Sequence, residues 1–296
     1  MPTRIDHVIA AAGDFPALEA AFGRLGFHVT GGGTHPHLGT RNRIIVLGEG
    51  YLELLGIADA ERASPAITRR LASGGSGWVG FALQSDDIAA EAAAMRSRAA
   101  DVRGPHPGRL VSPNGTGRSW RVLTHGSDDL WASAEPVPFL IQHDSAGAAH
   151  QTELAGEGSL APHANGALRI QAVTLALRSR SAAEAAFARV YALHPRGAPY
   201  PDETLRAEVR TLPLPADGEY IELATPAGPG IVQQRIALAG EGVCSLAVAV
   251  ASLAETRAFL SERGIAYTLA HGALWIEPAE TLNIPLRFVG IDIAAT

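Results

Sequence analysis

The feature that most constrains the fold of this chain is an internal repeat, in which an apolar strand leads into a capped helix four times. The four strands are expected at residues 5–12, 78–83, 170–177 and 243–250. After each strand comes a polar capping residue, and then apolar side chains at helical spacing. The expected caps are Asp14, then Asp86 or Asp87, then Ser181 with Glu184, and finally Ser252 with Glu255. This periodicity predicts four copies of one supersecondary unit.

The residues that follow each strand-helix pair indicate antiparallel strands. In the first copy, residues 43–47 and 51–57 are separated by Gly48-Glu49-Gly50. The third copy contains Tyr220-Ile221-Glu222-Leu223, nearly the same as Tyr51-Leu52-Glu53-Leu54 in the first, which indicates that the two halves are related. We therefore expect an α+β protein of four βαβββ modules, with curved mixed sheets and with the helices outside them.

The length and the local composition predict two domains. A chain of 296 residues is long for a single compact domain. Residues 144–165 are rich in Gly, Ala and Ser and have no apolar periodicity, which is typical of a linker. We predict a first domain over residues 1–145, a linker over 146–165 and a second domain over 166–296.

Composition and charge limit the partners of the chain. The net charge is −6 and the arginines are scattered, which argues against a nucleic-acid partner. The single cysteine, Cys244, excludes an intrachain disulfide and is expected to be a buried strand thiol. The start of the chain lacks the pattern of a secretory signal, and no apolar run approaches the roughly 20 residues that span a bilayer. We expect a cytoplasmic protein, monomeric or homodimeric, that has no membrane partner and no nucleotide cofactor.

Several motifs stand in a characteristic order along the first half. They are Ile5-Asp6-His7-Val8, residues 32–36 and 39–42, residues 50–54, Trp120-Arg121, and residues 138–141. In these motifs the chain resembles the vicinal-oxygen-chelate superfamily, and its first half resembles the glyoxalase-like domain family within it. The resemblance implies the modular fold predicted above. The superfamily includes lyases, isomerases, dioxygenases and drug-sequestering binding proteins, so the resemblance leaves the chemistry open.

The resemblance also implies a metal site in the first half. His7 and Glu53 match the positions of the metal ligands that one module contributes in glyoxalase I-like proteins. The partner module should add further ligands, but Gly80 stands where a second first-strand ligand is expected, and Gln142 or His143 falls near the place of Glu53. We expect His7, Glu53 and Gln142 to bind a divalent metal, namely Zn, Ni, Mn or Fe. The alternative is that His7 is a hydrogen-bonded residue of the core or the pocket.

A small-molecule ligand is expected to contact residues of one loop and of the flanking strands. These residues are His35, His37, Arg41, Asn42, Tyr51, Trp120 and Arg121. The loop over residues 35–42 should line the pocket mouth, with Arg41 and Asn42 available to a substrate carbonyl or carboxylate, or else be a rigid turn with solvated histidines. Side chains alternate along a strand, so only one of Trp120 and Arg121 can face the pocket.

Three functions are consistent with this pattern. The leading hypothesis is a metal-dependent lyase or isomerase in which Glu53 is both a ligand and the catalytic group that moves a proton. One alternative is a metal-free binding protein of the bleomycin-resistance type. The other is an extradiol-type dioxygenase, which needs two histidines and one carboxylate, and therefore needs His143 or a loop histidine in place of Gly80. Glu222 has no histidine in the first strand of its own module, so we expect the second half to be a metal-free structural copy.

Overall fold

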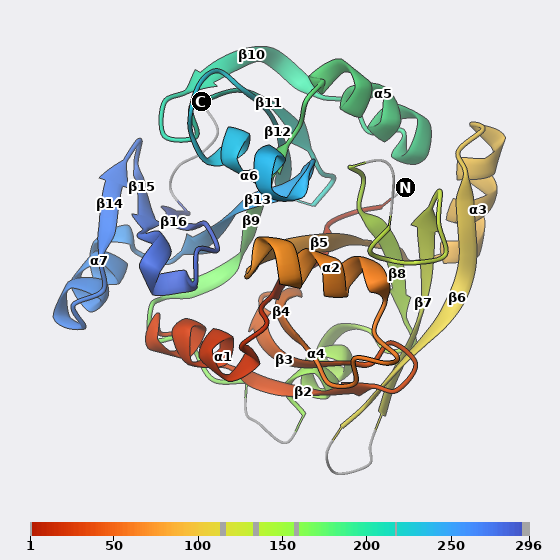
Figure 1. The fold of residues 1–296 in the computed structure, drawn as a ribbon, viewed down its shortest axis with the longest axis horizontal. Coiled ribbons are helices and arrows are strands. Elements are labelled where there is room, and N and C mark those ends of the chain that lie inside the picture. Colours follow the sequence, from red (N-terminus) through yellow and green to blue (C-terminus); the bar gives the residue numbers. More distant parts are fainter. Residues whose placement is uncertain (1, 113–116, 133–135, 157–159, 217, 292–296) are drawn as a thin grey trace.

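Two eight-stranded sheets, one from each half of the chain, organise the protein (Figure 1). The structure is a computed structural model, and it describes residues 2–112, 117–132, 136–156, 160–216 and 218–291. The first half contains β1 (Ile5–Ala11), α1 (Phe15–Arg24), β2 (Thr30–His35), β3 (Thr40–Leu47), β4 (Gly50–Ile57), α2 (Pro65–Gly74), β5 (Gly77–Gln84), α3 (Ile88–Ser97), β6 (Val102–Val111), β7 (Gly117–His125), β8 (Phe139–His143) and α4 (Gly147–Ala155). The second half contains β9 (Ala167–Ala176), α5 (Arg180–Tyr191), β10 (Arg196–Asp202), β11 (Ala207–Pro213), β12 (Tyr220–Pro226), α6 (Ile231–Ala239), β13 (Gly242–Val250), α7 (Leu253–Glu262), β14 (Tyr267–Ala270), β15 (Ala273–Ile276), the short 3-10 helix η1 (Pro278–Thr281) and β16 (Leu286–Gly290).

The strand pairing confirms the four βαβββ modules. In each module the first strand pairs in parallel with the last, as β1 does with β4 and β9 with β12. The modules of one half meet through their first strands, which pair antiparallel, as β1 does with β5. In the first half the sheet closes into a barrel, in the order β1-β4-β3-β2-β6-β7-β8-β5. The second sheet has the order β10-β11-β12-β9-β13-β16-β15-β14.

Three of the four predicted helix caps are confirmed. The side chains of Asp14, Asp87 and Ser252 each accept a hydrogen bond from a backbone N–H in the first turn of their helices. The prediction for the third helix was wrong, because Ser179 rather than Ser181 caps α5. Ser179 has the extended backbone that a cap requires, and its side chain accepts from the N–H of Ala182 at 3.3 Å. The helix therefore begins before Ser181.

Three helices do not appear in the sequence-based prediction, namely α2, α4 and α6. Helix α4 lies inside the segment predicted to be a linker, and it packs on β2 and β3. Its Leu154 is fully buried against Ile44 and Tyr51. A helix that buries so few side chains leaves almost no apolar periodicity in the sequence, which is why the segment resembled a linker.

The predicted turn over residues 35–42 is shorter in the structure. His35 ends β2 and residues 40–42 begin β3, so the turn covers residues 36–39. The glycines before His35 lie in a strand because β2 runs very close to β3. A Cβ on Gly32 would lie 2.2 Å from the carbonyl oxygen of Asn42, and Gly32 has a φ of +91°. Only glycine fits there.

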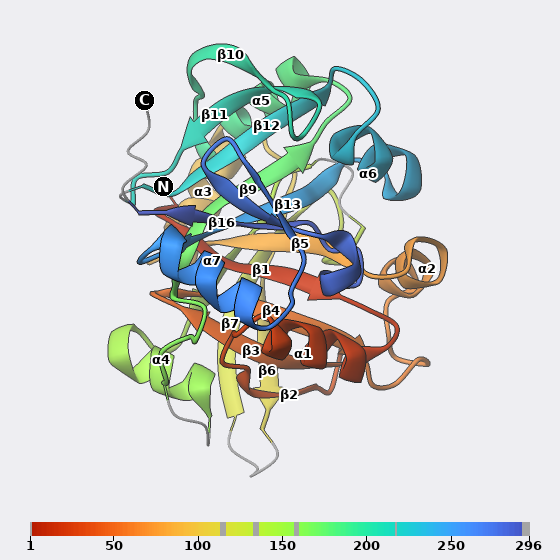
Figure 2. The ribbon, with the colours of Figure 1, turned by 90° about the vertical axis from the view of Figure 1, so that its left-hand side faces the viewer.

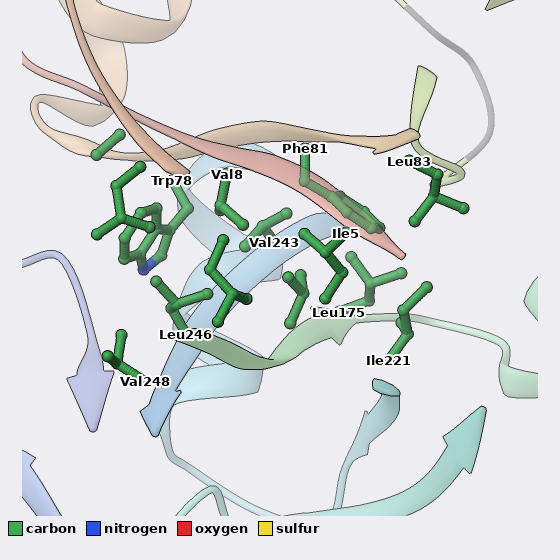
Figure 3. Close-up of a cluster of buried hydrophobic side chains, with 14 of the residues drawn as sticks. Ile5, Val8, Trp78, Phe81, Leu83, Leu175, Ile221, Val243, Leu246 and Val248 are labelled. Atoms are coloured by element: carbon green, nitrogen blue, oxygen red, sulfur yellow. The ribbon is translucent and has the colours of Figure 1, made fainter. Parts of the chain in front are cut away.

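The two halves share one hydrophobic core. Strands β1 and β5 of the barrel pack against β9 and β13 of the second sheet, and Figure 2 shows these strands as adjacent layers. Figure 3 shows Val8, Trp78 and Phe81 facing Leu175 and Leu246 across this boundary. The indole N–H of Trp78 also donates to the carbonyl of Pro285 at 2.8 Å. The halves are therefore joined by a continuous cluster of buried apolar side chains.

Cys244 is buried in β13, as predicted for a strand thiol. In the part of the chain that the structure describes, none of the helices combines the length and apolar character needed to cross a membrane.

Candidate functional site

A cavity of about 210 Å³ occupies the interior of the first-half barrel. Its wall is formed by inward-facing side chains of the barrel strands, which alternate with side chains that point outward. They include His7, His35, Asn42, Tyr51, Glu53, Arg118, Trp120 and His143. The wall thus combines imidazoles and aromatic rings with the buried carboxylate of Glu53 and the buried guanidinium of Arg118, while Arg109, Asp128 and Asp129 also line the cavity.

The buried carboxylate of Glu53 is the centre of this polar group. Its Oε1 accepts a hydrogen bond from Nδ2 of Asn42 at 2.7 Å. The Nε2 atom of His7 lies 3.7 Å from Oε2, and the Nε2 atom of His35 lies 3.8 Å from Oε1. Asn42 is itself held, because its Oδ1 accepts from the backbone N–H of Gly33 at 3.0 Å. Side chains from β1, β2 and β3 therefore meet at one carboxylate on β4.

Both histidine rings are fixed through their other nitrogen. The Nδ1 of His7 lies 2.6 Å from Oδ1 of Asp6, and the Nδ1 of His35 lies 2.9 Å from Oγ1 of Thr40. The His7 ring also stacks on Tyr51, with centroids 4.6 Å apart. Burial lowers the pKa of His35, although the charge of Glu53 partly opposes this, so the ring is neutral at pH 7. Each ring thus presents Nε2 to Glu53.

Asp6 connects His7 with a further histidine. Its Oδ1 also lies 3.2 Å from Nε2 of His143 on β8. Burial alone would raise the pKa of Asp6, but the adjacent His143 and His7 hold that pKa well below its usual range. His143 in turn lies against His150 of α4, with ring centroids 4.0 Å apart. Asp6 is therefore an ionised carboxylate that orients two imidazoles.

Most of the residues predicted to contact a ligand line this cavity. They are His35, His37, Asn42, Tyr51 and Trp120. His37 is exposed at the edge of the cavity, whereas the other four are more enclosed.

Three predicted residues lie elsewhere. Gln142 points away from the cavity, and its side chain accepts from the N–H of Ile88 at 3.0 Å and donates to the carbonyl of Asp86 at 2.7 Å. The register of β7 and β8 explains this, because Gln142 pairs with Arg121 on the outer face while His143 pairs with Trp120 on the inner face. Arg41 lies over the ring of Phe15, 4.7 Å from its centroid.

Arg118 is a cavity residue that the sequence-based analysis missed. It is 7% exposed and shares the inner face of β7 with Trp120. Its position could have indicated this, because Arg118 lies two residues before Trp120 on the same strand and residues two apart on a strand share one face. On the paired strand β6, Gly108 leaves room for the indole, since a Cβ there would lie 2.0 Å from Nε1 of Trp120.

The donors at this site match a divalent metal in kind. Two ligands that are each about 2.1 Å from a metal lie about 3.0–3.4 Å apart at octahedral or tetrahedral angles. The distances from Glu53 to His7 and His35, 3.7 and 3.8 Å, are longer than this by less than about 1 Å. Within the described ranges, no group of three or more His, Cys, Asp or Glu side chains is already close enough to hold an ion. The chemistry therefore fits a metal, provided that the imidazoles move slightly toward Glu53.

The second half replaces this arrangement with an ion pair. Glu222 has the sequence position that corresponds to Glu53, and Nη2 of Arg287 donates to its two oxygens at 2.7 and 2.8 Å. Thr174 also donates to this carboxylate, and the guanidinium lies over the ring of Trp275. Glu222 is thus neutralised by an arginine of its own half of the chain.

Comparisons with known proteins agree with the modular architecture. The chain resembles a hypothetical protein from Staphylococcus aureus with a TM-score of 0.65 and 16% identity, over 97% of this chain and 99% of the other. It resembles a mutant of 4-hydroxymandelate synthase from Streptomyces coelicolor with a TM-score of 0.68 and 13% identity, over 100% of this chain and 94% of the other. At these identities the likeness concerns the fold alone. No curated protein matches the chain in sequence.

The family comparison covers more than half of the chain. The glyoxalase-like domain matches residues 5–191, which include the whole barrel and extend through α5 of the second half. The match therefore continues beyond the first half, to which the resemblance of individual motifs was limited. Together with the four βαβββ modules, it shows that the chain belongs to the glyoxalase-like domain family of the vicinal-oxygen-chelate superfamily.

Proposed function

We propose that this protein is a divalent-metal-dependent enzyme of the lyase or isomerase type, which acts on a small oxygenated molecule in the barrel cavity. The observation that carries the proposal is the buried carboxylate of Glu53 between the Nε2 atoms of His7 and His35. A metal held by these three side chains would supply Lewis-acid stabilisation of negative charge on substrate oxygens.

Glu53 is the proton-transferring residue in this proposal. Asn42 donates to Oε1, whereas Oε2 accepts no hydrogen bond from the residues that the structure describes. Oε2 is therefore available to take a proton from a carbon next to a substrate carbonyl and to return it to the adjacent carbon. Asn42 keeps the carboxylate in one orientation during both transfers.

Metal analysis tests the proposal directly. Protein purified without chelator should contain close to one equivalent of divalent metal, and His7→Ala should lose most of it. His194→Ala is the matched control, because His194 is exposed in the second half and should keep the wild-type content. Absence of metal from the wild type would contradict the enzyme proposal and favour the metal-free binding protein.

A turnover screen tests the role of Glu53. Glu53→Gln retains the shape of the side chain and its acceptor for Asn42, but it removes the base. We expect it to abolish product formation and the exchange of substrate protons with deuterated solvent. A Glu53→Gln variant as active as the wild type would refute the proposed role.

A second candidate, an oxygenase, is favoured by the position of His35. His7, His35 and Glu53 together provide two histidines and one carboxylate, the donor set of non-haem iron oxygenases. This alternative requires a second histidine, since Gly80 cannot bind a metal through a side chain. His35, from the segment expected to form a loop over residues 35–42, supplies that histidine. Turnover measured in air and under anaerobic conditions separates the two candidates, since oxygen-independent product formation excludes the oxygenase.

A further inference from the structure

Arg118 is a buried cation that faces the barrel cavity and has no hydrogen-bond or ion-pair partner among the residues that the structure describes. Its side chain lines the cavity and is 7% exposed. Its Nε is buried and makes no hydrogen bond, and no carboxylate of the described residues lies within ion-pair distance of its guanidinium. A buried charge without compensation is unfavourable, so a counter-ion is expected at this position.

The carboxylates around the cavity already contact side chains other than Arg118. Asn42 donates to Glu53, His7 and His143 contact Asp6, and Nε2 of His106 lies 3.0 Å from Asp128 at the edge. Asp129 accepts a hydrogen bond from the hydroxyl of Ser64. None of these carboxylates is within ion-pair distance of Arg118. The counter-ion must therefore be a group other than the described carboxylates around the cavity.

The second half offers an internal comparison. There the buried arginine, Arg287, contacts both oxygens of Glu222. In the first half, the carboxylate of Glu53 and the guanidinium of Arg118 stand apart on the wall of one cavity. The same fold therefore has a closed ion pair in one half and separated charges in the other.

We infer that Arg118 binds the carboxylate of the substrate, so that the substrate is a small monocarboxylate whose further oxygens face Glu53. The second part of this inference rests on the proposed function. A guanidinium fork matches the two oxygens of a carboxylate. A phosphate dianion is less suitable, because the same cavity contains the negative charge of Glu53. The cavity volume of about 210 Å³ limits the ligand to a small molecule.

Thermal unfolding in the presence of matched probes tests the inference. Pyruvate is the charged probe and hydroxyacetone is a neutral probe of similar size, with lactate, benzoylformate and inorganic phosphate completing the panel. A ligand that binds only the folded state raises its melting temperature. We expect the carboxylates to raise the melting temperature of the wild type more than hydroxyacetone or phosphate does.

Two substitutions on β7 localise the effect. Arg118→Met should weaken carboxylate binding by roughly tenfold or more, as expected for the loss of charge-assisted hydrogen bonds. Without ligand it should melt at the same temperature as the wild type or higher, because an unpaired buried charge is removed. Arg121→Met is the control, since Arg121 faces outward beside Gln142 and should leave binding unchanged. Arg118→Lys should bind more strongly than Arg118→Met.

Several results would overturn the inference. These are a wild type that none of the carboxylates stabilises, a preference for phosphate, or an Arg118→Met variant that binds pyruvate as the wild type does. A ligand-free Arg118→Met variant that melts several degrees lower would show that the guanidinium is structural. Repeating the titration with chelator separates this inference from the proposed function. If the protein takes up no metal but its carboxylate binding depends on Arg118, the inference is supported and the metalloenzyme proposal is refuted. If the protein takes up metal but its carboxylate binding does not depend on Arg118, the metalloenzyme proposal is supported and the inference is refuted.

Discussion

At the scale of single residues, Asp6 connects the candidate site to strand β8, which is separated from β1 by β5 in the barrel. It is buried, and its one carboxylate contacts His7 beside it on β1 and His143 on β8. Its ionised state depends on both imidazoles, because burial alone would raise its pKa. A carboxylate that holds the Nδ1 of a ligating histidine sets the direction of the ring and increases its basicity.

Asp6→Asn should therefore weaken metal binding without unfolding the protein. The amide can still accept a hydrogen bond from His7, but it lacks the negative charge. We expect the metal affinity to fall by roughly 10–100-fold, measured by calorimetric titration. Asp144→Asn is the control, because Asp144 accepts from the Ser119 hydroxyl on the exposed surface. Equal affinities in Asp6→Asn and the wild type would show that Asp6 does not support the site.

At the scale of elements, α4 is the helix that braces the site from outside the barrel. It packs on β2 and β3, and its Leu154 contacts Ile44 and Tyr51. Tyr51 is the ring on which His7 stacks. The segment predicted to be a linker thus supports the wall of the candidate site.

Leu154→Ala should destabilise the protein and loosen this wall. Removing a fully buried leucine side chain costs about 2–5 kcal/mol of unfolding free energy. Thr152→Ala, on the exposed side of the same helix, should change it by no more than about 0.5 kcal/mol. Urea unfolding measures both variants. A loss in Leu154→Ala as small as that in Thr152→Ala would mean that α4 contributes little to the fold.

At the scale of the whole molecule, Glu219 connects the start of the chain to the second half. Its Oε2 accepts from the backbone N–H of Ile5 at 2.7 Å. Burial raises the pKa of Glu219 from 4.5 to about 7. Between these pH values the folded protein binds a proton that the unfolded chain has released, so this group makes the unfolding free energy decrease as pH rises from about 4.5 to 7.

Glu219→Gln should remove this decrease. The amide oxygen can still accept from Ile5 but carries no titrating proton. At pH 8 the variant should be more stable than the wild type, by at most about 3 kcal/mol, and near pH 4.5 the two should be similar. Urea unfolding at both pH values measures the difference, with Glu262→Gln on the exposed face of α7 as the control. A variant whose unfolding free energy keeps the wild-type pH dependence would contradict the expected role of Glu219.

The sequence by itself determined the modules of this protein and the two residues at the centre of its candidate site. Apolar periodicity and helix caps are local properties, so the first strand of each module, four of the helices and three of the caps could be read from neighbouring residues. The faces of His7 and Glu53 follow from strand alternation in the same way.

The tertiary structure decided what surrounds those two residues. The barrel brings His35 to Glu53 and His143 to Asp6, and the register of β7 with β8 turns Gln142 outward. These contacts join residues far apart in the chain, and a shift of one residue in register would exchange the inner and outer faces. The tertiary structure also decided that Arg118 has no ion-pair partner among the described residues, because the partner of a charge depends on which side chains the fold brings within reach.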